Sequence, residues 1–216
     1  MSSPSNPIGL ISGVAKDNIE WNHGCDKVES SILASAKRLI IERGVQGTSM
    51  AAIARDAGIS RPTLYARYEN RDAIVRQLLN NEIVGLLDTV FPIPTTLEDF
   101  INQIIQVAEK AIGSKFLKSI VSHDPEALVT YQYARLGRSQ LTLIRFIKNI
   151  ILKLQQDNNI SQEKICKDDP EVLATFVLST TQAVALQSTA LEPHLAGRTT
   201  WKIELSKILK GYLSNV

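Results

Sequence analysis

Residues 48–72 read TSMAAIARDAGISRPTLYARYENRD, and this stretch decides the fold. Its apolar residues recur at the spacing of two short helices that pack together across a tight turn. Gly58 stands at the turn, where the chain needs a positive φ that only glycine adopts without steric cost. Ala54 stands where two crossing helices need a side chain no larger than a methyl group. The pattern predicts a helix-turn-helix, whose shared core is formed by Ile53, Ala57, Ile59, Leu64 and Tyr68.

The second helix of this motif carries the polar chemistry. Ser60 is expected to start it, because its hydroxyl can accept a hydrogen bond from a free amide of the first turn. A helix of about eight residues is ~12 Å long, which matches the width of a DNA major groove. We therefore expect Arg61 to donate two hydrogen bonds to guanine and Pro62 to contact a thymine methyl. Polar residues around them are expected to hold phosphates, and with Ser60 they complete the DNA-binding set: Thr48, Thr63, Tyr65, Arg67 and Arg71. Arg55 is expected to be a solvated surface residue.

The segment LIIERGVQGTSMAAIARDAGISRPTLYARYENRDAI, residues 39–74, resembles the N-terminal domain of the TetR/AcrR family of transcriptional repressors. The resemblance runs from about Val28 to Leu79 without a gap. It rests on Arg43-Gly44, Gly47-Thr48, Ile53-Ala54, Gly58-Ile59-Ser60, Thr63-Leu64-Tyr65 and Asn70-Arg71-Asp72. Two positions depart from the family, since Ile40 and Tyr68 stand where it usually has Phe. The hydroxyl of Tyr68 is expected to reach water or a phosphate.

The resemblance implies an all-α protein with two domains. We expect a tail at residues 1–24 without fixed structure, a three-helix DNA-binding domain at 25–72, and a helical domain at 73–216 that binds an effector and dimerises. The implied function is a transcriptional regulator, a repressor that a small molecule releases from a palindromic operator. The implied partners are double-stranded DNA, the effector and a second copy of the chain.

Beyond the motif, helical periodicity continues to the end of the chain. Residues 141–154 are apolar nearly all round, which predicts burial at the centre of a bundle. His123 is expected to start a helix with the Asp-Pro pair that follows it. Apolar stripes on residues 170–191 and 201–213 fit a four-helix dimer interface of the resembled family, and they fit the core of a monomer equally well.

Polar residues interrupt these apolar helices, and they are our candidates for an effector pocket, because a cavity for a mostly apolar ligand needs a few convergent polar atoms. The alternative is that each faces solvent or a dimer seam. The candidates are Gln103, His123, Tyr131, Arg135, Gln182 and Gln187.

Composition sets the remaining limits. The chain has 216 residues, 44% of them hydrophobic, and a net charge of +2, so whole-chain charge gives no hint of nucleic acid. Cys25 and Cys166 are isolated thiols without a disulfide framework or a paired-cysteine metal spacing. No export signal and no apolar run of about 20 residues is visible, so we expect a cytoplasmic protein without a membrane segment.

Three scattered histidines and the lack of a glycine-rich phosphate loop predict no enzyme, no cofactor and no metal. Two alternatives stay open at this stage. One is an enzyme built on a helical bundle, and the other is an interaction protein that retains the helix-turn-helix only as a fold element.

Overall fold

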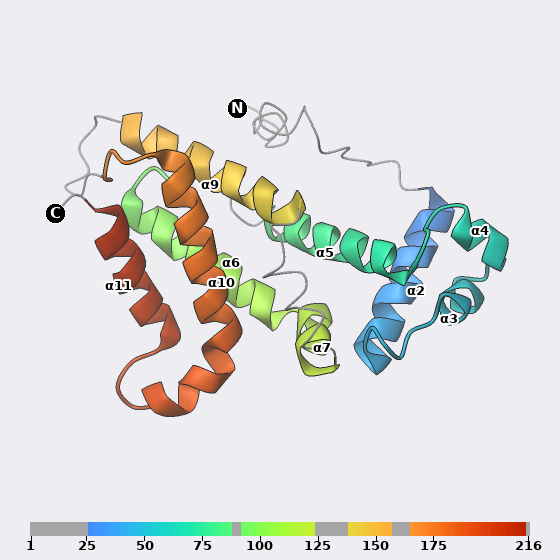
Figure 1. Cartoon of the computed structure of the whole chain (residues 1–216). Helices are drawn as coiled ribbons and strands as arrows, with labels where there is room; N and C mark the ends of the chain where they lie inside the picture. The colour runs from blue at the N-terminus through green and yellow to red at the C-terminus, as the bar shows by residue number, and fades with distance from the viewer. Residues whose placement is uncertain (1–25, 88–91, 124–137, 157–164, 215–216) are drawn as a thin grey trace, which may run out of the picture. The chain divides into compact units, whose positions relative to one another are not determined.

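The computed structural model describes residues 26–87, 92–123, 138–156 and 165–214, and most of these residues lie in helices (Figure 1). Within them the only β-type pairing is a single bridge between Ile165 and Ser214. The predicted all-α class is confirmed. By contacts the chain divides into two compact units. We call residues 23–88 and 109–140 the helix-turn-helix unit, and residues 89–108 and 141–216 the C-terminal unit.

Helix α2 (Lys27–Arg43) is the first described helix of the helix-turn-helix unit and has 17 residues. It begins where Asp26 accepts a hydrogen bond from the amide of Val28 at 3.1 Å, and it ends at Gly44, which has a φ of 73°. Its inward face is buried and consists of Ile32, Leu33, Ala36, Leu39 and Ile40.

Helices α3 (Met50–Asp56) and α4 (Arg61–Tyr65) form the predicted helix-turn-helix. Gly58 has a φ of 68°, and the amide of Ile59 donates to the carbonyl of Ala54 at 3.0 Å, which closes the turn. Ile53, Ala54 and Leu64 are at most 1% exposed. Tyr68 is also buried, and Ala57 and Ile59 pack against the core while partly exposed.

Helix α5 (Arg71–Leu87) follows, and its start is capped by Asn70, whose side chain accepts from the amide of Ala73 at 2.9 Å. Its first turns bury Ile74, Val75 and Leu78 in the same core.

Helix α7 (Lys115–His123) belongs to the helix-turn-helix unit, although it lies far downstream in the sequence. It packs along α2 (Figure 1), and its Phe116 and Ile120 are at most 1% exposed within the core around α2, α3, α4 and α5. The hydroxyl of Ser119 donates to the carbonyl of Ile40 at 2.7 Å. His123 lies in the last turn of α7, and the helix predicted to start with the Asp-Pro pair after it lies outside the described residues.

The predicted boundary between residues 72 and 73 does not coincide with the compact units. Helices α5 and α7 bury their apolar sides against α2, because the motif's own two short helices cover only part of that face. As a division of functions, the predicted domains at 25–72 and 73–216 remain a prediction. The tail predicted at residues 1–24 lies outside the described residues.

The C-terminal unit contains most of α6 (Leu97–Gly113), with α9 (Arg138–Gln156), α10 (Pro170–Leu195) and α11 (Trp201–Leu213). Helices α10 and α11 pack side by side (Figure 1). Helix α9 is amphipathic, since Ile144, Ile147, Ile150 and Ile151 are buried while Leu141 is 43% exposed. The prediction that residues 141–154 are buried on all sides is therefore wrong, because a helix near the edge of a unit needs only one apolar face.

Helix α11 likewise buries only part of its predicted apolar stripe. Trp201, Leu205 and Leu209 are buried, whereas Ile208 is 50% and Tyr212 39% exposed. The neighbouring α10 exposes Val172 and Phe176 in the same way. The two helices together thus pack with one apolar face and leave other apolar side chains uncovered.

We predict that Phe116→Ala lowers the free energy of unfolding by about 3 to 5 kcal/mol, because it opens a cavity in the core that α7 shares with α2. Val121→Ala in the same helix removes a side chain that is 41% exposed and serves as the control, with an expected change within about 0.5 kcal/mol. Urea denaturation followed by circular dichroism measures both. Equal stability of the two variants would show that α7 is not part of this core.

Candidate nucleic-acid interface

Helix α4 exposes its polar residues to solvent and packs its apolar side against a buried core. The side chain of Ser60 accepts a hydrogen bond from the amide of Thr63 at 3.2 Å, and the two hydroxyls lie 2.8 Å apart. This is the predicted start of the helix. Arg61 and Pro62 are exposed at its first two positions, and Tyr65 is 54% exposed at its end. Side chains at these positions can reach a groove of DNA without any change in the core.

Arg67, just after α4, is held by a long-range ion pair. Its guanidinium donates to the carboxylate of Asp26 at the start of α2. The pKa of Asp26 is lowered from its ordinary value, first by the hydrogen bond from the amide of Val28 and then by Arg67. The carboxylate is therefore ionised at neutral pH and compensates part of the charge that Arg67 would bring to a phosphate.

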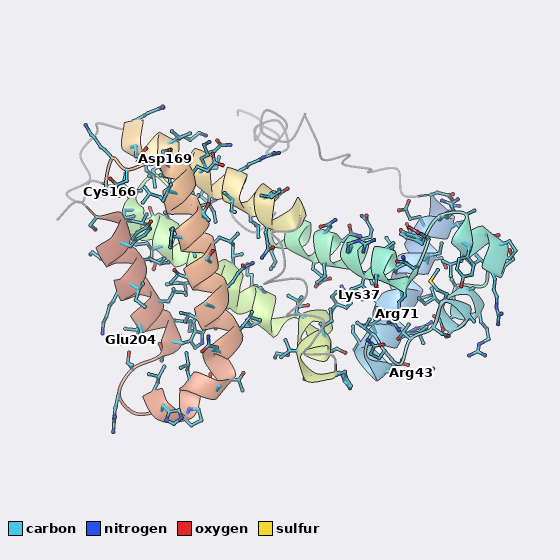
Figure 2. The ribbon with its side chains drawn as sticks, in the orientation of Figure 1. Lys37, Arg43, Arg71, Cys166, Asp169 and Glu204 are labelled. Atoms are coloured by element: carbon cyan, nitrogen blue, oxygen red, sulfur yellow. The ribbon has the colours of Figure 1, made fainter. Side chains whose placement is uncertain are left out.

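Arg71, which is labelled in Figure 2, and Thr48 both bond to the loop between α2 and α3. The guanidinium of Arg71 donates to the carbonyls of Gln46 and Thr48 at 3.4 Å each, and to the side-chain oxygen of Gln46 at 3.2 Å. The Thr48 hydroxyl donates to the carbonyl of Gly44 at 2.8 Å, and its side chain is 1% exposed. These contacts disfavour a direct phosphate contact by Thr48. They give Arg71 a second role, since it fixes the loop that leads into α3.

Tyr68 uses its hydroxyl inside the protein. It donates to the carboxylate of Glu29 on α2 at 3.0 Å, so the expectation that this group reaches water or a phosphate is wrong. The physical reason is that Tyr68 is only 8% exposed, and a buried hydroxyl needs a partner within the fold.

Comparisons with known proteins agree with this geometry. Residues 32–78 match the family model described as bacterial regulatory proteins of the tetR family. An HTH-type transcriptional regulator of Mycobacterium tuberculosis is 31% identical over 182 residues, which cover 84% of this chain and 92% of the relative. The chain belongs to the TetR family.

Solved structures share the fold at lower identity. A TetR-family transcriptional regulator from Pectobacterium atrosepticum has a TM-score of 0.65 at 20% identity and covers 85% of this chain and 93% of that one. SmeT, the repressor of the Stenotrophomonas maltophilia multidrug efflux pump SmeDEF, has a TM-score of 0.59 at 14% identity, covering 88% and 93%. FadR from Bacillus subtilis, solved with stearoyl-CoA, has a TM-score of 0.59 at 15% identity, covering 85% and 98%.

In this TetR-family chain the predicted effector residues fall in different places. Gln103 on α6 and Gln182 on α10 are partly buried, and Gln187 on α10 is exposed. His123 lies in the other unit, where its ring nitrogen Nδ1 is 3.0 Å from the carbonyl of Ser119. Tyr131 and Arg135 lie outside the described residues. Their assignment to one pocket stays a prediction.

Two buried oxygen atoms of the C-terminal unit lack a partner among the described residues. The side chain of Gln103 donates to the carbonyl of Pro92 at 2.7 Å, but its oxygen accepts from nothing there. Thr181 on α10 is 8% exposed, and its hydroxyl is also unpaired. Leaving a polar atom buried and unpaired costs free energy, so such atoms are candidates for ligand contacts. Thr181 is one of the polar residues that interrupt the apolar sequence of α10, but that local pattern does not show which polar atoms lack a partner.

Glu82 connects three helices of the helix-turn-helix unit. Its carboxylate pairs with Lys37 on α2 (Figure 2), and it accepts a hydrogen bond at 2.8 Å from Ser114, immediately before α7. These contacts and the buried Phe116 connect the segment around α7 to α2.

The described residues contain no cluster of three or more His, Cys, Asp or Glu side chains that could hold a metal ion. No helix among them is long and apolar enough to span a membrane.

We predict that Asp26→Asn tightens binding to any DNA duplex at low salt, because it removes a negative charge beside the interface and releases Arg67. Asn also caps helices, so α2 keeps its start. Asp168→Asn, which removes an exposed charge from the C-terminal unit, is the control and should leave affinity unchanged. Fluorescence anisotropy with labelled duplex measures both. Weaker binding by Asp26→Asn would mean that Asp26 positions Arg67 for its contact.

Proposed function

We propose that this TetR-family protein is a non-enzymatic repressor in the cytoplasm, which binds a palindromic operator as a homodimer and leaves it when a small-molecule effector binds. The observation that carries the proposal is α4, which exposes Arg61, Pro62 and Tyr65 directly above a fully buried core. A rigid helix that presents a short polar end is what base reading in a major groove requires.

The dimer is supported by uncovered apolar side chains on α10 and α11. Val172 and Phe176 on α10, and Ile208 and Tyr212 on α11, are 39 to 57% exposed. The rings of Phe176 and Tyr212 lie 6.1 Å apart, which joins the apolar surface of the two helices. Contiguous exposed apolar surface marks an interaction site, and resemblance to the family points to a second copy of the same two helices.

The effector is supported by the unpaired oxygens of Gln103 and Thr181 in the C-terminal unit. Among proteins of similar fold, one was solved with stearoyl-CoA and another represses a multidrug efflux pump, which favours a largely apolar ligand. By linkage, an effector that lowers operator affinity a hundredfold must bind the DNA-free protein a hundredfold better, a coupling of about 2.7 kcal/mol. We propose that α7 carries this coupling to α2 through Phe116 and Glu82.

Selection of bound fragments from genomic DNA tests the function as a whole. We expect an inverted repeat whose half-sites lie about one helical turn apart, because two copies of the motif bind with two-fold symmetry. A compound library screened for release of that fragment then identifies the effector. Failure to enrich any palindrome would contradict the proposed function.

For the recognition helix, we predict that Arg61→Ala weakens operator binding by about 1 to 3 kcal/mol and relaxes the preference at one base pair per half-site. Arg145→Ala removes the same charge from exposed α9 and should change neither property. Selection from randomised duplexes measures preference, and anisotropy measures affinity. An unchanged sequence preference in Arg61→Ala would remove Arg61 from the base-reading set.

For the dimer, we predict that Phe176→Asp shifts the protein to monomer at micromolar concentration, because it places a charge in the apolar face of α10 and α11. Leu141→Asp alters an exposed apolar residue of α9 and should leave the dimer intact. Sedimentation velocity distinguishes the two states. A dimeric Phe176→Asp variant would place the interface elsewhere.

A further inference from the structure

A hollow of about 320 Å³ lies beside α3 and the start of α4. Its apolar lining consists of Ala51, Ala52, Ala54 and Ile59, and its polar lining consists of Ser49, Arg55 and Arg61. The alanines have no atom beyond Cβ, so a ligand can approach the backbone of α3 closely. None of the sequence patterns pointed to this hollow, because its lining comes from two helices and the turn between them.

Both arginines of the hollow have free side chains. Among the described residues, neither Arg55 nor Arg61 forms a hydrogen bond or ion pair with its guanidinium. Their neighbours differ, since Arg38 pairs with Asp56 and Arg67 pairs with Asp26. The carboxylate next to Arg55 in the sequence is thus already occupied. Two unpaired cations at the edge of one hollow create a local positive potential that favours an anion.

Ser49 adds a hydrogen-bond donor to the same hollow. Its side-chain oxygen accepts from the amide of Ala52 at 3.1 Å, which starts α3. A hydroxyl that accepts one bond still has its own hydrogen to donate. The hollow therefore offers the planar guanidinium group of Arg55 and the hydroxyl of Ser49 as hydrogen-bond donors to the oxygens of one anionic group.

We propose that this hollow receives one phosphate of the DNA backbone in each half-site, bound by Arg55 and Ser49, while Arg61 beside it reads a base edge. The proposal rests on the proposed DNA-binding function. The first helix of a helix-turn-helix crosses the sugar-phosphate backbone and the second enters the major groove. Arg55 is on the first helix and Arg61 on the second, so their positions separate the two roles. Arg55, expected from the sequence to be merely solvated, thereby joins the interface.

The experiment measures affinity of the full-length protein against salt concentration, for the selected operator and for a random duplex. Arg55→Ala should weaken binding to both duplexes by the same factor. It should also flatten the slope of log affinity against log salt by about 0.9 per lost phosphate contact, or about 1.8 for a dimer. Arg55→Lys should keep most of the slope, because the charge remains. Arg145→Ala is the matched control, and thermal melting checks that each variant is folded.

Two results would overturn the proposal. A slope and affinity equal to those of the wild type would show that Arg55 is only solvated. A change in base preference at one position, with the slope kept, would make Arg55 a base reader. If the wild type itself prefers no operator, the proposed function fails, and the slope on the random duplex still decides whether Arg55 holds a phosphate.

Discussion

Helix α2 buries its apolar face against α3, α5 and α7, and this packing fixes the position of the helix-turn-helix. The two helices of the motif are seven and five residues long, too short to be stable alone. Their orientation relative to each other is fixed because Ile53, Ala54 and Leu64 are buried in the core around α2. Helix α7 completes that core with Phe116, so residues far outside the motif determine how rigidly α4 is presented.

The same packing connects α7, which we propose carries the effector signal, to α2. Ser119 of α7 donates to the carbonyl of Ile40 near the end of α2, across 79 positions of the sequence. Glu82 ties Lys37 of α2 to Ser114 before α7. A ligand signal that moved α7 would therefore be felt by α2 and, through the shared core, by the recognition helix. Packed cores transmit such shifts because they are dense and have few alternative arrangements.

The arginines around the helix-turn-helix differ in whether their guanidinium groups are paired, and this matters more than how many arginines there are. Arg38 and Arg67 are paired with carboxylates, and Arg71 binds loop carbonyls. Arg55 and Arg61 have no partner for their guanidinium groups among the described residues, and they share one hollow. Charge counted along the whole sequence gives only a net +2, whereas in the described part of the chain two guanidinium groups without a partner lie beside α3 and α4. That distribution favours recognition of a backbone phosphate next to a base pair.

The sequence by itself determined the local structure of the motif and its family. Positive φ at Gly58, the cap by Ser60 and the buried positions of α2 follow from residues only a few positions apart. The tertiary structure decided what depends on distant residues. It gave the Tyr68 hydroxyl to Glu29 and Arg67 to Asp26, across 39 and 41 positions, and it left one side of α9 exposed. A short-range sequence pattern predicts which face of a helix is apolar. The residues that contact that face and its polar groups are determined only by tertiary packing.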